Sequence, residues 1–382
     1  MVTMSHRERV MTAISLKEPD RVPMDLGSHV NSSIHIVAYE ALKQHLGVRI
    51  EGLPPLVSKM MLDVKVDEPV LQALHIDTRG VFAGLPDKGN PDDLEGGEWV
   101  DEWGVKRIMP PGAHYYDLVL PAPLGGDITA VDIARYPWPQ PKNGAVVENL
   151  KKQVKYLRET TDCAIVLNLP SAFVHQSQYM RGFEDWFMDL AANPSLAEAM
   201  FDACLEAKMA SAEVILDAVG REVDILLTSD DMGTQRSVMF SPATYRKLFK
   251  PRHKRYFDFI RSKSDAPLMM HSCGSVSAIL NDLIDIGVQI LNPVQTHAKD
   301  MDPVYLKKTF GDRIAFWGGV DIQHVLPFGS PDDVRTEVRH LFETLGEGGG
   351  WVLCPSHNIQ PEVPPQNIVA MYEAGLELGW YM

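Results

Sequence analysis

The sequence has few cysteines, no excess of basic residues and no long hydrophobic run. Only four cysteines occur among 382 residues, too few for a disulfide-stabilised scaffold. Lys and Arg number 36 against 51 Asp and Glu, which gives a net charge of -15. This acidic balance argues against nucleic acid as a partner, because phosphate binding needs a basic face. No apolar run reaches the roughly 18 residues that cross a bilayer, so we expect no membrane association.

The N-terminal segment also lacks the apolar core of a secretory signal peptide. Its residues 1–21 are rich in charged side chains, and we therefore expect a cytoplasmic location. Short-period repeats and low-complexity tracts are not found either. What the chain has is 45% hydrophobic residues, enough for a large core, and a length typical of one barrel with insertions.

Short apolar, β-branched segments alternate along the chain with amphipathic stretches, the pattern of parallel strands joined by helices. Eight strands are predicted, at 21–26, 77–83, 163–169, 224–229, 267–272, 289–294, 314–319 and 351–356. Helices are predicted at 33–46, 146–160, 183–219, 241–263, 275–286, 303–310, 331–345 and 365–378. Ser241-Pro242 and Ser330-Pro331 each favour a helix start. The sequence thus predicts an α/β fold, a (β/α)8 TIM barrel with 1–382 as a single domain.

Residues 85–142 interrupt this regular alternation. They are rich in Gly, Pro and aromatic side chains, and alternating patterns around Trp99–Val105 and Tyr115–Leu120 indicate a β-hairpin. The segment has too few apolar residues for a core of its own. We interpret it as an insertion in the N-terminal half that covers one mouth of the barrel.

Polar side chains follow most of the predicted strands, at the end where barrel enzymes build their active sites. Three of them, Asp230, Asp231 and Asp321, are candidate catalytic residues, suited to holding a substrate hydroxyl or a cationic group. The candidate substrate-binding residues are the amides Asn168, Gln235, Asn292, Gln295 and Asn358. Structural roles compete with these functional ones: Asp230 is also placed to cap a helix, and Asn292 to satisfy a strand end.

The most informative motif is His271-Ser272-Cys273 at the end of the 267–272 strand. Residues two apart on a strand face the same side, so the imidazole and the thiol are placed to bind one metal ion. Zinc favours nitrogen and sulfur ligands, and catalytic zinc commonly has three protein ligands and an open position.

A third ligand is expected from the last predicted strand, which supplies both Cys354 and His357. Spacing alone does not separate these two. Cys163 begins a strand and Cys204 lies in a helix rich in Met and Ala, so both are interpreted as core thiols. For His29, His114 and His175, which fall in loops near the same mouth, packing or surface roles are favoured over catalysis.

The chain resembles the uroporphyrinogen decarboxylase superfamily, and within it the cobalamin-dependent methyltransferases. The resemblance runs through RERVMTAISLKEPDRVPMDLG, RGFEDWFMDLAANPSLAEAMFD, HSCGSVSAILNDLIDIGVQILNPVQ, FWGGVDIQHVLPFG and PSHNIQPEVPPQN. It implies a (β/α)8 barrel, in agreement with the strand count. It also implies a zinc ion held by His271, Cys273 and a distal ligand, and a methyl group exchanged with cobalamin on a partner protein.

The distal ligand departs from the pattern of the family, in which a cysteine directly precedes a short Gly-Ile-like segment. That register falls on His357, before Asn358-Ile359, whereas Cys354 comes three residues early. The zinc set implied is therefore His/Cys/His or His/Cys/Cys.

The decarboxylase activity itself is disfavoured. The resemblance would require an arginine-rich segment where this chain has PMDLGSHVNSS, which contains no arginine, and an F-S-D loop where it has Ala83-Gly84-Leu85. A tetrapyrrole with many carboxylates needs several bidentate arginine contacts.

The expected activity is therefore that of a zinc-dependent methyltransferase, of O-demethylase type or similar. It would act between a small-molecule methyl donor or acceptor and a separate corrinoid protein, because the chain lacks a D-x-H-x-x-G corrinoid-binding motif. The alternatives are a lyase acting on a carboxylated small molecule and a non-catalytic binding barrel. The identity of the methyl donor and the oligomeric state stay open.

Overall fold

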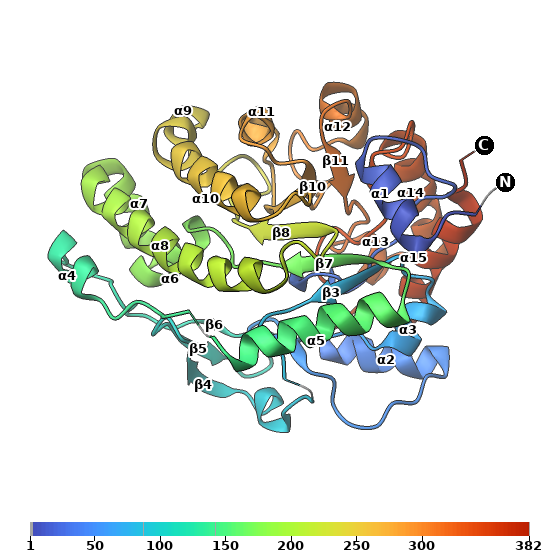
Figure 1. The fold of residues 1–382 in the computed structure, drawn as a ribbon, viewed down its shortest axis with the longest axis horizontal. Coiled ribbons are helices and arrows are strands. Elements are labelled where there is room, and N and C mark those ends of the chain that lie inside the picture. Colours follow the sequence, from blue (N-terminus) through green and yellow to red (C-terminus); the bar gives the residue numbers. More distant parts are fainter. Residues whose placement is uncertain (1–2, 87, 142, 382) are drawn as a thin grey trace.

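The computed structural model describes residues 3–86, 88–141 and 143–381, and its centre is a curled sheet of seven parallel strands (Figure 1). In sheet order the strands are β12 (Trp351–Val352), β11 (Ala315–Trp317), β10 (Ile290–Asn292), β9 (Leu268–His271), β8 (Ile225–Ser229), β7 (Ala164–Asn168) and β3 (Thr78–Val81). Each lies within a predicted strand. The predicted α/β barrel is confirmed.

The predicted first strand, 21–26, does not form a regular strand. Met24 makes an isolated parallel bridge to Leu353, and Asp77 N donates to Met24 O at 2.9 Å on the other side. Pro23 has no N–H to donate, and the N–H of Met24 goes to the Asp77 carboxylate at 2.8 Å instead of to a strand carbonyl. The segment therefore links β12 to β3 and closes the barrel without a continuous ladder.

Side chains on the strands alternate between two cores, as the two-residue period of a strand requires. On β7, Ala164 and Val166 belong to the core inside the barrel, whereas Ile165 and Leu167 pack outward against the helices. The inner core also contains Val10 and Ile14 of α1 (His6–Ile14). Helix α1 therefore covers the N-terminal end of the barrel, and the opposite end is left for a site.

The predicted helices are found around the sheet, with two changes. The segment 183–219 is two helices because Pro194 has no N–H for a continuous helix, and 241–263 contains a π-helical turn, Tyr245–Phe249. The bounds are α2 (Ile36–Leu46), α5 (Ala145–Thr160), α7 (Phe183–Ala192), α8 (Pro194–Val219), α9 (Pro242–Thr244), α10 (Lys250–Lys263), α11 (Ser277–Asp285), α12 (Pro303–Phe310), α14 (Pro331–Thr344) and α15 (Pro365–Leu378).

Among the described residues, five α-helices and two 3-10 helices were not predicted from the sequence. They are α1, α3 (Glu68–Ala73), α4 (Ala130–Arg135), α6 (Val174–Arg181) and α13 (Val325–Phe328), together with η1 (Val30–Ser32) and η2 (Pro91–Leu94). In the part of the chain that the structure describes, no helix is both long and apolar enough to cross a bilayer.

The insertion forms a three-stranded antiparallel sheet of β4 (Gly97–Val100), β5 (Lys106–Met109) and β6 (Asp117–Leu118). The two segments predicted to form a hairpin overlap β4 and β6, but these strands do not pair with each other, because β5 lies between them. Trp103 and Tyr116 join the outer core, as expected for a segment without its own. A second hairpin consists of β1 (Leu56–Ser58) and β2 (Asp63–Val64). Tyr116 N donates to Met60 O of this hairpin at 2.9 Å, which places the insertion against it.

Candidate metal centre

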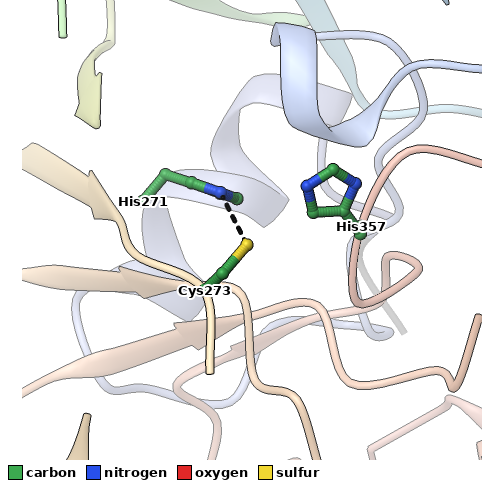
Figure 2. Close-up of side chains that lie close together, drawn as sticks. All are labelled: His271, Cys273 and His357. Atoms are coloured by element: carbon green, nitrogen blue, oxygen red, sulfur yellow. Dashed lines mark hydrogen bonds between the residues drawn. The ribbon is translucent and has the colours of Figure 1, made fainter. Parts of the chain in front are cut away.

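Three of the four predicted metal ligands lie together at the C-terminal end of the sheet. His271 is the last residue of β9, Cys273 follows it, and His357 comes from the loop after β12 on the opposite side (Figure 2). One donor atom from each residue lies within 4.8 Å of the other two, and Cys273 Sγ is 3.4 Å from His271 Nε2. Two imidazoles and one thiol form a donor set that suits zinc.

Asparagine side chains hold both imidazoles by the ring nitrogen that faces away from this group. The 2.6 Å contact from His271 Nδ1 to Asn292 Oδ1 makes Nδ1 the donor, because Asn292 Nδ2 already donates to Trp317 O at 3.1 Å. His357 Nδ1 contacts Asn358 Oδ1 in the same way. Each ring is thereby held with an unprotonated Nε2 turned toward the group, where His271 Nε2 faces the Cys273 thiol. Metal-binding histidines are usually held by the other ring nitrogen in this way.

Burial sets the protonation of the three residues. It lowers the pKa of His271 to about 3, although Asp231 acts in the opposite direction. It also lowers the pKa of His357 and raises that of the Cys273 thiol well above its usual value. Both imidazoles are therefore neutral near pH 7 and ready to bind a cation, and the thiol must lose its proton when it does.

The two neighbouring aspartates, Asp230 and Asp231, differ in what they contact. Asp231 accepts Cys273 N at 2.9 Å and lies 3.6 Å from His271 Nε2 and 3.5 Å from His175 Nδ1. Asp230 is buried, accepts three backbone N–H groups at the start of α6 and contacts His253 at 3.1 Å. Asp231 thus lies at the candidate centre, whereas Asp230 anchors α6.

Cys354, the fourth predicted ligand, lies outside this group. It is buried in the inner core of the barrel, where its Sγ donates to Asp25 Oδ2 at 3.7 Å. The same carboxylate oxygen accepts Trp317 Nε1 at 2.9 Å, and Oδ1 accepts the Thr78 hydroxyl at 2.5 Å. The structure therefore favours His357 over Cys354 as the third ligand.

The remaining predicted polar residues hold loops in place. Gln295 Oε1 accepts Gly274 N at 2.6 Å just after Cys273. Asp321 accepts three successive backbone N–H groups of its own loop. Asn168 donates to Ser28 O and Val81 O at 3.0 and 3.2 Å. Asn358 donates to Asp63 at 2.8 Å, and the side chain of Gln235 is exposed.

A cavity of about 340 Å³ adjoins the candidate centre. Its lining includes His271, His357 and Asp231, together with residues from η1 (Val30–Ser32), the β1–β2 hairpin and α6. From the sequence we had not selected the lining residues Ser58, Met60, Met61, Asp63, Gln176 and Tyr179. No local signal marks them: they come from an unpredicted hairpin and an unpredicted helix, and they meet the centre only in the folded chain.

The fold and the three-donor group define a barrel with a candidate metal centre at its C-terminal mouth. Residues 122–378, about two thirds of the chain, match the family model of uroporphyrinogen decarboxylase (URO-D). The chain belongs to this family, which confirms the resemblance inferred from the sequence.

Relatives within the family include methyltransferases. A methylcobamide:CoM methyltransferase, MtaA, of Methanosarcina barkeri is 29% identical over 179 residues, 47% of this chain and 48% of the relative. MtaA from M. barkeri strain Fusaro is 25% identical over 252 residues, 62% of this chain and 69% of the relative. The match thus spans about half the length of the first relative. Both relatives are methyltransferases, which agrees with the resemblance to the methyltransferase branch of the superfamily.

The chain is also similar to a decarboxylase and to a solved methyltransferase structure. A uroporphyrinogen decarboxylase of Methylococcus capsulatus is 35% identical over only 68 residues, 18% of this chain and 19% of the relative. A solved methyltransferase structure from Methanosarcina mazei aligns over 98% of this chain and 99% of its own, with a TM-score of 0.67 at 18% identity. At that identity the structural match supports the shared fold.

Proposed function

We propose that this chain is a zinc-dependent methyltransferase that moves a methyl group between a small molecule and a corrinoid protein. The observation that carries the proposal is the convergence of His271, Cys273 and His357 beside a cavity. The two methyltransferases, which match 47% and 62% of this chain, support the reaction class.

The residues fit a zinc ion in number, type and orientation. The unprotonated Nε2 atoms of the two imidazoles and one sulfur lie close together, and three protein ligands leave one position for substrate. When bound, zinc acts as a Lewis acid that lowers the pKa of a coordinated thiol or hydroxyl group. Asn292 and Asn358 keep the two imidazoles in the ligating tautomer, and such outer contacts strongly affect metal affinity.

We assign proton handling at this site to Asp231 and His175 rather than to Asp230 or Asp321. Asp231 Oδ2 lies 3.5 Å from His175 Nδ1, and His175 Nε2 contacts the Tyr179 hydroxyl at 2.5 Å. All three residues line the cavity. This chain of groups leads from the candidate centre into α6 and is placed to accept a proton that a substrate loses on binding.

The corrinoid belongs to a separate partner protein in this proposal, because the sequence contains no D-x-H-x-x-G motif. Such a partner would approach the C-terminal mouth, since α1 covers the opposite end of the barrel. The decarboxylase alternative lacks comparable support: the segment 23–33 has no arginine, and its Asp25 carboxylate is engaged inside the protein.

Metal content and methyl transfer test the proposal together. The protein purified without chelator should carry about one zinc per chain, measured by plasma mass spectrometry, and His271→Ala and Cys273→Ser should each lose it. The wild type should methylate free cob(I)alamin from a suitable methyl donor, followed by visible absorption, and the two variants should not. Cys163→Ser, at the far end of β7, is the matched control and should retain both properties. A metal-free wild-type protein, or full transfer by the His271 variant, would refute the proposal.

A further inference from the structure

The cavity beside the candidate centre has no positively charged lining. Its described lining residues include three acidic side chains, Asp63, Asp230 and Asp231, and no Lys or Arg. Burial raises the pKa of Asp63 well above its usual value, so Asp63 adds least to the negative charge. Three histidines also line the cavity, and two of these are the proposed metal ligands. Apart from the proposed metal ion, these residues offer no fixed counter-charge to an anion that enters the cavity.

Two basic side chains that neighbour lining residues have partners of their own. Lys59, beside the lining residues Ser58 and Met60, pairs with Asp93 at 2.7 Å. Arg107 pairs with Asp101 at 3.3 Å, and its guanidinium lies 4.4 Å from the centre of the Tyr179 ring. Neither residue lines the cavity.

Three buried polar atoms of the described lining have no hydrogen-bond partner: Nδ1 of His175, Nε2 of Gln176 and Oδ2 of Asp63. His175 Nδ1 lies 3.5 Å from Asp231 Oδ2. Gln176 is 8% exposed and Asp63 is 1% exposed. Buried polar groups are nearly always satisfied, so orphans in a binding cavity point to a ligand group that completes them. The amide N–H of Gln176 needs a hydrogen-bond acceptor, and a hydroxyl group can both accept and donate a hydrogen bond.

We infer that the small-molecule substrate of this site is uncharged, carries a hydrogen-bonding group such as a hydroxyl, and is selected against anions. The inference rests on the proposed function, because it concerns the molecule that would share the metal with His271, Cys273 and His357. An anionic substituent would lie among carboxylates, whereas a hydroxyl would satisfy Gln176 Nε2 without bringing a charge into the cavity.

Three thiols of similar size separate the possible charges. Protein loaded with Co(II) is titrated with 2-mercaptoethanol, 2-mercaptoethanesulfonate and 2-aminoethanethiol, and binding is followed by the sulfur-to-cobalt absorption bands. We expect 2-mercaptoethanol to bind at least about tenfold more tightly than the sulfonate. Equal or tighter binding of the sulfonate, or tighter binding of the ammonium thiol, would overturn the inference.

A charge added to the lining provides the second test. Met61 is half-buried, lines the cavity and is absent from the hydrophobic core clusters, so Met61→Lys should be tolerated, and Met61→Gln is the uncharged control. We expect Met61→Lys to bind the sulfonate thiol about fivefold or more tightly than wild type does, and Met61→Gln to show no gain. A gain of the same size in both variants would contradict the electrostatic basis.

The outcomes distinguish the two proposals. A protein that binds no Co(II), or binds it equally after His271→Ala, removes the proposed metal centre and with it the proposed function. A protein that loads Co(II) through His271 but prefers the sulfonate leaves the metal centre intact and refutes only the substrate class.

Discussion

Two clusters of similar residues lie at the same end of the barrel and differ in how their donor atoms are arranged. In the candidate metal centre, one donor atom each of His271, Cys273 and His357 converges, and the contact between Cys273 Sγ and His271 Nε2 lies within this group. In the second cluster, His29 lies 3.6 Å from Asp25, its ring nitrogens have no hydrogen-bond partner, and both Cys354 and Trp317 donate to that carboxylate. Residue type alone does not make a metal site. The difference is that three donor atoms face one another in the first cluster, whereas in the second the thiol and the indole N–H are both bound to one carboxylate.

The largest expected effect comes from removing the Cys273 thiol, and removal of the Cys354 thiol is the comparison. Cys273→Ala should reduce bound zinc from about one per chain to less than about a tenth, because a ligand is lost. Cys354→Ala removes the same thiol from the second cluster and should retain full zinc content. Plasma mass spectrometry after gel filtration measures both. Loss of zinc in the Cys354 variant, with an unchanged circular dichroism spectrum, would show that the comparison is wrong.

A smaller effect is expected when the support of a ligand is removed and the ligand stays. Asn292→Ala leaves His271 Nδ1 without its acceptor and should weaken zinc binding about 10- to 100-fold, measured by competition with a chromophoric chelator. Gln295→Ala, which removes a contact to the Gly274 backbone, serves as the control and should change affinity less. An unchanged affinity in Asn292→Ala would mean that the ring orientation has another cause.

The second cluster should respond in stability and not in metal content. Asp25→Asn replaces one acceptor oxygen by an NH2 group that cannot accept, so either Trp317 and Cys354 or Thr78 and the Ser28 N–H lose their acceptor. We expect a loss of about 1–3 kcal/mol in the free energy of unfolding, measured by urea denaturation of the metal-free protein. Zinc stoichiometry should remain at the wild-type value. Loss of zinc in this variant would show that the second cluster also contributes to metal binding.

Glu337 of α14 lies outside both clusters and tests how stability depends on pH: its Oε2 has no hydrogen-bond partner among the described residues. Burial raises its pKa to about 8 from the ordinary value of 4.5. The folded protein therefore holds a proton that the unfolded chain releases above about pH 4.5, and stability falls as the pH rises from about 4.5 to 8. Glu337→Gln should remove this contribution, so its Tm should exceed that of wild type more at pH 8.5 than at pH 5. A constant Tm difference would contradict the shifted pKa.

The strands of the barrel were predictable because most of them are short apolar segments buried on both faces, although β3 contains Arg79 and Gly80. The same property placed His271, Cys273 and Asn292 correctly at strand ends. The 21–26 segment has the same composition, but Pro23 and the Asp77 carboxylate remove the hydrogen bonds of a regular ladder. The hydrogen bond from Met24 N to the Asp77 carboxylate joins residues more than fifty positions apart, so the local sequence pattern does not reveal it.

Helix α6 and the choice between Cys354 and His357 could not be predicted from the sequence, for a different reason. Helix α6 buries Gln176, Ser177 and Gln178 as well as Val174 and Met180, so it shows no apolar stripe at helical spacing. Cys354 and His357 are only three residues apart, and the chain leaves the inner core between them. Which of the two meets His271 is decided by the course of that loop.

The orientation of His271 is tied to the alignment of three strands. His271 on β9 is paired in register with Asn292 on β10, and Asn292 in turn donates to the Trp317 carbonyl on β11. A slip of one residue would turn Asn292 to the other face of the sheet. Zinc uptake during refolding would therefore report when β9, β10 and β11 have found their native alignment, and it would do so before any catalytic assay is possible.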